Sequence, residues 1–380
     1  MRRFIKQYLT IWLDVIKDRS IFLTMVLSVV FYGFFYPFAY QAQRPADLPI
    51  VIVDEEQSPL TQAIIHTTSH TPNIHVLAVV SDFRQAQMLV QSAKADGILL
   101  LPDNLSQSIH HGQTGGVGLY LSSAYFLRTQ NIGAGLVSSL QATIIQELGQ
   151  VTQTRHKPKP ELIHQSALFN PLSGYGSYIF PAVAPIIVYQ TIVLGLAMLV
   201  AGYRQRLWRA SACDFLAIYA VALTIGCLSC FYLFGFVFWW HDYPRGGNFW
   251  GMMLGVPIFV SCAIGVALLI ASWVADGAKV GVLLIFSSVP LFMLTGLAYP
   301  LMAMPKFLQP LAHALPTTQG VQMFIQLNQM GVPIQDVWQK MAYLASVAVL
   351  CLGAAFWRLR YTANGVGKMQ KLPPFFSKKC

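Results

Sequence analysis

Residues 178–202 read YIFPAVAPIIVYQTIVLGLAMLVAG, twenty-five residues without Asp, Glu, Lys or Arg. A helix that crosses a bilayer needs about 20 mostly apolar residues, and a charge at its centre costs about 2.5–3.5 kcal/mol. This stretch therefore predicts a membrane-spanning helix. The whole chain of 380 residues is 55% hydrophobic and only 11% charged, whereas soluble domains carry about 25% charged residues. The composition excludes an ordinary cytosolic enzyme.

Comparable charge-free runs lie on both sides of this stretch, and the same criterion predicts six transmembrane helices. The predicted spans are 20–43, 173–203, 214–240, 248–275, 279–301 and 338–357. A further run, Phe307–Gln335, contains six Gln and three Pro, so we interpret 302–337 as short extracytoplasmic helices. The apolar part of the first span, Ile21–Tyr40, is longer than the core of a signal peptide, which predicts a retained anchor.

The net charge of +10 gives this arrangement an orientation. With a cytosolic N-terminus, the segments 1–19, 204–213 and 358–380 and the loop at Lys279 hold 15 Lys and Arg. The short outside loops hold only Arg245, Lys306 and Lys340. Because cytosolic loops are enriched in Lys and Arg, both termini are predicted to be cytosolic. This orientation explains the positive net charge without a nucleic-acid partner.

Two of the predicted cytosolic segments have sequence patterns that suggest a role in addition to orientation. Residues 1–19 predict a basic amphipathic helix, with Ile5, Leu9 and Trp12 on its apolar side. It is either a simple membrane anchor or a contact for a cytosolic partner. The loop YRQRLWR at 203–209 contains three Arg and one aromatic side chain that we expect to be exposed, Trp208. It is either a positive clamp or a docking element for another subunit.

Residues 44–172 predict an α/β extracytoplasmic domain between spans one and two. Apolar strand patterns occupy 49–53, 75–80, 97–101 and 118–121. Helix starts are predicted at Pro59, after Ser81 or Asp82, and at Pro102–Asp103, and one long helix over 125–153. Strands that alternate with helices predict a small mixed sheet.

This domain offers no evident catalytic or metal site. Asp54 and the two Glu after it have no nucleophile beside them, and we interpret them as a solvated turn with helix capping. His66 and His70 are four residues apart with His75 nearby, but they have no acidic or Cys partner at fitting spacing, so no metal site is predicted. The Gly365–Lys368 stretch lacks the spacing of a phosphate-binding loop.

The predicted spans contain no Asp, Glu, Lys or Arg near their middle. Proton-coupled transporters keep such groups in the membrane. If the chain transports a substrate, the energy therefore comes from another source.

The order of elements and several motifs resemble the ABC-2 type permeases, the membrane subunits of ATP-binding-cassette exporters. The motifs are KDRS at 17–20, PIVIVD at 49–54 with Ser58, GILLLP at 97–102, NPLSGY at 170–175 leading into FPA at 180–182, and GLAYP at 296–300 followed by Met304-Pro305, Leu308 and Pro316-Thr317. The resemblance covers nearly the whole chain. It points to the subgroup with one N-terminal span, a large extracytoplasmic domain and five further spans. Many relatives have an acidic loop after the second span, whereas this chain has a basic one.

The resemblance implies a permease subunit that moves an apolar or amphiphilic substrate outward across the bacterial inner membrane. It would pair with a second, identical or related permease chain, and each would dock a cytosolic ATPase that binds ATP and Mg²⁺. This chain would bind no cofactor itself. A periplasmic adaptor, an outer-membrane channel and membrane lipid are further partners that the resemblance suggests.

The same resemblance assigns residues to two roles. The coupling element for the ATPase maps to Arg204, Arg206, Leu207, Trp208 and Arg209. The substrate pathway maps to Tyr178, Phe180, Pro181, Tyr189, Gln190, Leu294 and Tyr299. For each aromatic residue of the pathway, ordinary helix packing is the alternative. For the chain as a whole, the alternative is a membrane-anchored partner-binding or assembly protein without transport. A membrane enzyme is disfavoured because no paired acids or nucleophile motif is found.

Overall fold

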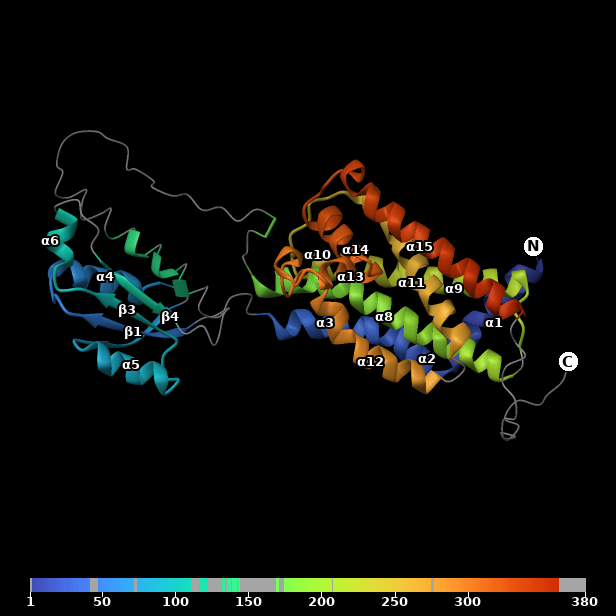
Figure 1. Cartoon of the computed structure of the whole chain (residues 1–380), viewed down its shortest axis with the longest axis horizontal. Helices are drawn as coiled ribbons and strands as arrows, with labels where there is room; N and C mark the ends of the chain where they lie inside the picture. Colours follow the sequence, from blue (N-terminus) through green and yellow to red (C-terminus); the bar gives the residue numbers. More distant parts are fainter. Residues whose placement is uncertain are drawn as a thin grey trace. The chain divides into compact units, whose positions relative to one another are not determined.

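The computed structural model describes residues 2–41, 47–71, 74–110, 116–121, parts of 132–143, 169–170, 174–206, 208–274 and 277–361. The chain divides into two compact units. One is helical and comprises Met1–Gln41 with Ala167–Cys380, and the other, Ala42–Ser166, contains the sheet (Figure 1).

The helical unit starts with α1 (Arg2–Lys17), which is followed by a helix of three segments, α2 (Arg19–Phe22), η1 (Leu23–Leu27) and α3 (Ser28–Ala39). After the α/β unit come α8 (Tyr175–Gln205), α9 (Ala212–Phe231), η3 (Tyr232–Val237), α10 (Phe238–Trp240), α11 (Phe249–Trp273) and α12 (Gly277–Met293). The last elements are η4 (Leu301–Ala303), α13 (Leu308–His313), α14 (Pro316–Phe324), η5 (Ile325–Gln329) and α15 (Ile334–Tyr361).

Five helical stretches among the described residues are long and apolar enough to span a membrane. They are Arg19–Ala39, Tyr175–Gln205, Ala212–Trp240, Phe249–Trp273 and Ile334–Tyr361. The predicted fifth span is shorter than expected, because α12 ends at Met293 after 17 residues. Gly296 follows with a φ of +88°, a left-handed conformation that suits glycine and turns the chain out of the helix. The prediction of a helix to residue 301 is therefore wrong at this end.

The stretch at 178–202 forms the centre of the helical unit. It lies in α8, which packs against α3, α9, α11, α12 and α14. In the most apolar part of α8, 78% of the residues are buried, whereas in the most apolar part of α15 only 22% are buried. A helix that is apolar on all sides is stable when other helices surround it. The even hydrophobicity of this stretch is thus explained by its central position.

The short helices predicted between residues 302 and 337 are present, and they pack among the longer helices. Gly320 of α14 lies against the Phe259 ring of α11, so closely that an added Cβ would come within 2.2 Å of that ring. Thr318 donates a hydrogen bond of 3.1 Å to the Leu294 carbonyl. Tyr343 of α15 donates one of 2.6 Å to the Ala314 carbonyl, at the turn between α13 and α14. This segment is therefore part of the helical core.

The α/β unit contains a four-stranded mixed sheet in the order β2-β1-β3-β4. The strands are β1 (Leu48–Asp54), β2 (Ile74–Val80), β3 (Gly97–Leu101) and β4 (Gly118–Leu121). β1 pairs in parallel with β2 and with β3, and β4 is antiparallel to β3. The last two strands occupy the predicted residues. The predicted helix over 125–153 falls mostly outside the described residues.

Helices cover both faces of this sheet. α4 (Pro59–Ser69) buries Ile64 against Ile50 and Ile52, and α5 (Phe83–Gln91) buries Ala86 on the opposite face. A third helix, α6 (Leu105–His110), follows β3. The interpretation of Asp54 as solvated is wrong. It is only 6% exposed, and its carboxylate accepts hydrogen bonds from the Gln57 backbone and from the Thr61 hydroxyl.

Candidate functional site

Several helix ends meet at one end of the helical unit, which we call the basic end. Arg204, near the end of α8, donates a hydrogen bond of 2.6 Å to the Ala271 carbonyl near the end of α11. The Arg358 guanidinium of α15 lies 3.7 Å from the centroid of the Trp273 ring. The backbone of Ala210, just before α9, donates to the Leu359 carbonyl. The ends of α8, α11 and α15 and the start of α9 therefore form one surface.

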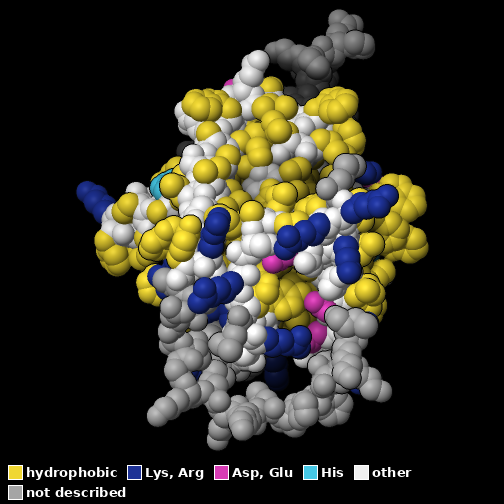
Figure 2. Space-filling view, turned by 90° about the vertical axis from the view of Figure 1, so that its right-hand side faces the viewer, with side chains coloured by type: hydrophobic (Ala, Val, Ile, Leu, Met, Phe, Trp, Pro, Cys, Tyr) yellow, Lys and Arg dark blue, Asp and Glu magenta, His cyan; other side chains and the backbone are white. Residues whose placement is uncertain are grey.

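This surface is strongly positive. Among the described residues it carries eleven cationic side chains, Arg2, Arg3, Lys6, Lys17, Arg19, Arg204, Arg206, Arg209, Lys279, Arg358 and Arg360, against three acids, Asp14, Asp18 and Asp214. Figure 2 views this end and shows Lys and Arg side chains spread over it. At the opposite helix ends, the described residues of the unit have three cations, Arg245, Lys306 and Lys340, and two acids, Asp242 and Asp336. The charge is thus concentrated at one end.

The amphipathic helix α1 is attached to this surface. Tyr203 of α8 donates a hydrogen bond of 2.7 Å to the Asp14 carboxylate, and the hydroxyls of Tyr8 and Thr224 lie 3.1 Å apart. Ile11 and Val15 are buried against the other helices. A second apolar stripe of α1 is exposed, and its members are Ile5, Leu9, Leu13 and Ile16. The helix therefore packs on the protein by one side and leaves apolar side chains on another.

The five residues assigned to the coupling element differ in position. Arg206 and Arg209 are exposed. Arg204 is turned inward onto α11. Trp208 is half-buried and packs on the Tyr203 ring at a centroid distance of 5.5 Å, so the expectation of an exposed aromatic side chain is wrong. Leu207 lies outside the described residues. Two arginines thus lie on the surface of the loop, while Arg204 and Trp208 fix the loop to the helices.

Sequence reasoning missed the acidic partner of this loop. Asp14 is the one acid within the polar side of α1, and a lone acid among cations is the only signal that the sequence contains. Its contact with Tyr203 joins residues 189 positions apart in the chain. Trp273, which lies under the Arg358 guanidinium, was missed as well. The sequence signal at this position is a Trp at the end of a predicted span, which is typical of an interfacial aromatic side chain.

The residues assigned to the substrate pathway fall into two groups. Phe180, Pro181 and Tyr189 are buried, and Phe180 packs on the Phe238 ring at 5.9 Å. Such burial is what the alternative of ordinary helix packing predicts for these three. Tyr178 and Tyr299 are exposed, while Leu294 and Gln190 are half-buried. The Tyr178 hydroxyl donates a hydrogen bond of 2.7 Å to the Leu297 carbonyl, beyond the end of α12.

Gln190 of α8 and Thr317 of α14 belong to two helices that pack together. Val321 packs with Ala182 and Ile186 of α8, and the Gln329 amide donates to the Ser177 carbonyl. α14 and η5 therefore run antiparallel to α8. Because of this antiparallel arrangement, Gln190 of α8 and Thr317 of α14 each lie about one helical turn from the contact of Val321 with Ile186, in the same direction along the helices.

The Gln190 amide nitrogen and the Thr317 hydroxyl oxygen are both buried, and neither has a hydrogen-bond partner among the described residues. Buried polar groups without a partner are rare and call for an explanation. α8 and α14 thus present two neutral hydrogen-bonding groups at a similar level of the helical unit.

No candidate metal centre is found in the described part of the chain. It contains no group of three or more His, Cys, Asp or Glu side chains that could hold a metal ion. His66 and His70 do lie together, with ring centroids 4.3 Å apart. The Nδ1 atom of His70 is 2.7 Å from the His66 carbonyl, so the backbone occupies this nitrogen.

The fold and the basic end define a multi-pass membrane protein with an α/β domain after its first span. Comparison with known families gives the class. Residues 19–357 match the ABC-2 family transporter proteins, and the chain belongs to this family. Permeases of this family lack an ATPase domain and work with a separate ATP-binding-cassette ATPase. No curated protein matches the chain.

Proposed function

We propose that the chain is the permease subunit of an exporter that moves an apolar or amphiphilic substrate outward with energy from ATP hydrolysed by a separate cytosolic subunit. The observation that carries this proposal is the match to ABC-2 transporters over residues 19–357, together with the basic end. The membrane is the bacterial inner membrane, and both termini are cytosolic. α12 serves as the fifth of six spans, because about 17 residues are the lower limit for crossing a bilayer.

The loop 206–209 is the proposed contact for the ATPase, through Arg206 and Arg209. Its neighbours Tyr203 and Arg204 connect it to α1 and to α11. A displacement of this loop would therefore move α8 together with those helices as one body. Rigid-body movement of packed helices is a common form of transition between two states.

The substrate pathway follows α8, with α12 and α14 beside it. The spans among the described residues carry no formal charge near their middle. Among the buried polar groups without a partner in α8 and in the neighbouring α14 and η5 are the neutral side chains of Gln190, Thr317, Gln326 and Asn328. A substrate with an apolar body and an uncharged hydrogen-bonding group fits this environment. A second permease chain would complete the pathway, and a periplasmic adaptor would contact the α/β unit.

Purification with partners tests this function. The full chain, affinity-tagged and extracted from its native membrane, is expected to retain an ATP-binding-cassette ATPase and to hydrolyse ATP. The control is the same preparation from cells whose ATPase has an inactive nucleotide site, and it should show no hydrolysis. Purification of the chain without any ATPase would contradict the proposal and favour a membrane-anchored assembly protein.

The proposed cytosolic position of the C-terminus can be tested separately. Cys380 is the last residue of the chain, and in intact cells it is expected to be protected from a membrane-impermeant thiol reagent. It should react after the cells are opened. Labelling in intact cells would contradict cytosolic placement of the C-terminus.

A further inference from the structure

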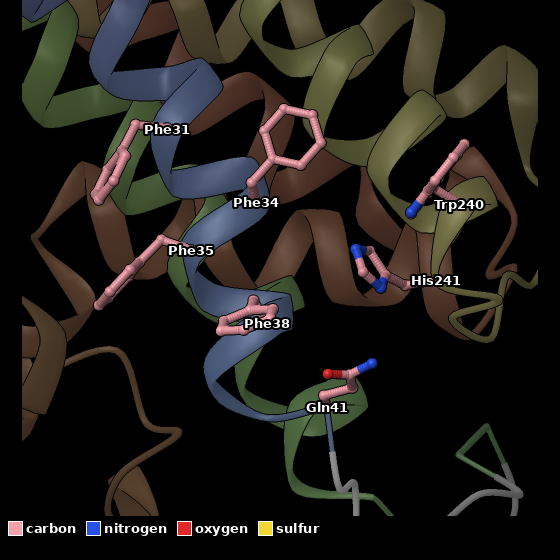
Figure 3. Close-up of a pocket in the computed structure, with 7 residues that line it drawn as sticks. All are labelled: Phe31, Phe34, Phe35, Phe38, Gln41, Trp240 and His241. Carbon is pink, nitrogen blue, oxygen red and sulfur yellow. The ribbon is translucent and has the colours of Figure 1, made fainter.

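The first and third membrane helices form an aromatic groove at their outer ends, away from the basic end. Figure 3 shows its lining. The residues are Phe31, Phe34, Phe35, Phe38, Gln41, Trp240 and His241, and the volume is about 400 Å³. This volume lies within the range of about 300–1,000 Å³ for small-molecule sites. All seven residues belong to the helical unit.

The rings of the groove are largely exposed, and Phe34 also packs against the third membrane helix, with its ring centroid 6.5 Å from that of Tyr232. The opposite side of α3 is the packed one, with Val29, Gly33 and Pro37 buried. There the Tyr232 hydroxyl donates a hydrogen bond of 3.2 Å to the Val30 carbonyl, and an added Cβ on Gly33 would lie 2.6 Å from the Tyr232 ring. This close approach holds the two helices together beside the groove.

The aromatic rings of the groove stay exposed although they cluster. Phe38 is 75% exposed and Trp240 is 60% exposed. Phe31 and Phe35 stack with centroids 5.2 Å apart. In a membrane, exposed side chains at this position face hydrocarbon and the boundary with the headgroups.

The groove has the length of one leaflet. Phe31 and Gln41 are ten residues apart, and Gln41 lies two residues beyond the end of α3, so at the helical rise per residue their separation along the axis is about 15 Å. Half of a hydrocarbon core of about 30 Å is also about 15 Å. A straight acyl chain that lies along α3 would therefore reach from the level of Gln41 to the level of Phe31.

The polar groups of the groove lie at one end only. Gln41 and His241 follow the last helical turns of their spans, and all the other lining residues are aromatic hydrocarbons or indole. Partial burial lowers the pKa of His241 below its usual value and so favours the neutral form of this imidazole. The described lining therefore has an apolar body and an uncharged, hydrogen-bonding mouth.

We propose that this groove binds a phospholipid of the outer leaflet, with one acyl chain along the Phe side chains and the ester region at Gln41 and His241. The length of the groove, its one polar end and its lack of charge each match this occupant. The neutral mouth favours a zwitterionic headgroup over an anionic one. This proposal does not depend on the proposed transport function.

Fluorescence quenching by brominated lipid tests the groove. The full chain is reconstituted in vesicles with increasing mole fractions of phosphatidylethanolamine brominated on its acyl chains. The signal of Trp240 is obtained by subtracting that of a Trp240→Phe variant. Trp250 of α11, which is 75% exposed and lies outside the groove, is measured in the same way as the reference. We expect half-quenching of Trp240 at an about fivefold lower mole fraction than that of Trp250.

Two variants separate a site from general contact with lipid. Phe34→Ala combined with Phe38→Ala should raise the half-quenching fraction of Trp240 to that of Trp250. Phe286→Ala, which removes a 78% exposed ring of α12 outside the groove, should leave it unchanged. Equal quenching of the two Trp side chains, or no effect of the double variant, would overturn the proposal. Equally strong quenching by a brominated alkane would overturn the role of the polar mouth.

Discussion

Removal of one hydroxyl should loosen the attachment of α1 to the basic end. Tyr203→Phe deletes the hydrogen bond of 2.7 Å from α8 to the Asp14 carboxylate and leaves the ring in place against Trp208. A hydrogen bond to a charged group contributes about 1.5–3 kcal/mol. Because both residues are only half-buried, we take the lower end, about 1.5 kcal/mol.

A loss of this size corresponds to an about tenfold change in the docking equilibrium of α1. Amide hydrogen exchange reports this equilibrium, since local opening limits the exchange of protected amides. In the reconstituted full chain, the amides of α1 should exchange about tenfold faster after Tyr203→Phe, while those of α11 should keep their rates.

The matched control is Tyr219→Phe, which removes a hydroxyl that lies 2.8 Å from Ser261 and joins α9 to α11. It deletes a neutral hydrogen bond elsewhere in the same unit and should leave the exchange of α1 unchanged. Asp14→Asn, which keeps an acceptor oxygen but loses the charge, should fall between the wild-type chain and Tyr203→Phe. Unchanged exchange of α1 in Tyr203→Phe would refute the reasoning.

Three further predictions concern coupling, helix packing and capping. Arg206→Glu combined with Arg209→Glu reverses the exposed charges of the loop and should lower ATP hydrolysis by the complex at least about tenfold, a loss of at least about 1.4 kcal/mol of interaction. Gly195→Val should destabilise the helical unit by about 1–3 kcal/mol, seen as a lower thermal midpoint, because an added Cβ would lie 2.0 Å from Met25. Ser58→Ala removes the capping box of α4, and the amides of that helix should exchange about fivefold faster, for a cost of about 1 kcal/mol.

Each of these changes has a partner that should have little effect. Lys306→Glu with Lys340→Glu reverses charges at the opposite helix ends and should leave hydrolysis unchanged. Gly202→Val adds a side chain on the same helix where nothing lies within 4 Å, and should keep the thermal midpoint. Ser69→Ala is the control for α4, since its hydroxyl donates to the Ile65 carbonyl of its own helix. Equal effects within a pair would count against the corresponding contact.

Local patterns predicted the elements of the fold. The apolar runs at 97–101 and 118–121 are strands β3 and β4, and Pro59 starts α4 as expected. Charge-free runs found the five long spans, because the energy of a charge in hydrocarbon acts on each helix by itself. The end of α12 was misjudged. Residues 294–301 remain uncharged, but the helix ends at Met293 and Gly296 follows in a left-handed conformation.

The candidate site was less accessible to sequence reasoning. Three arginines in one loop look equivalent in sequence, but the Ala271 carbonyl, 67 positions further along the chain, draws Arg204 inward. The burial of Trp208 depends on the Tyr203 ring. The position of α14 depends on the close approach of Gly320 to the Phe259 ring of α11. These are contacts between distant segments, which no local pattern specifies.

The central claim is that a cytosolic ATPase docks on the basic end, and site-specific photocrosslinking tests it most directly. A photoreactive amino acid is placed at position 206 or 209, and in separate chains at 306 or 338, on the opposite helix ends. Irradiation of the intact complex should give an adduct with the ATPase from 206 and 209 and none from 306 and 338. Adducts from the second pair of positions, or none from the first pair in a complex that hydrolyses ATP, would contradict the account.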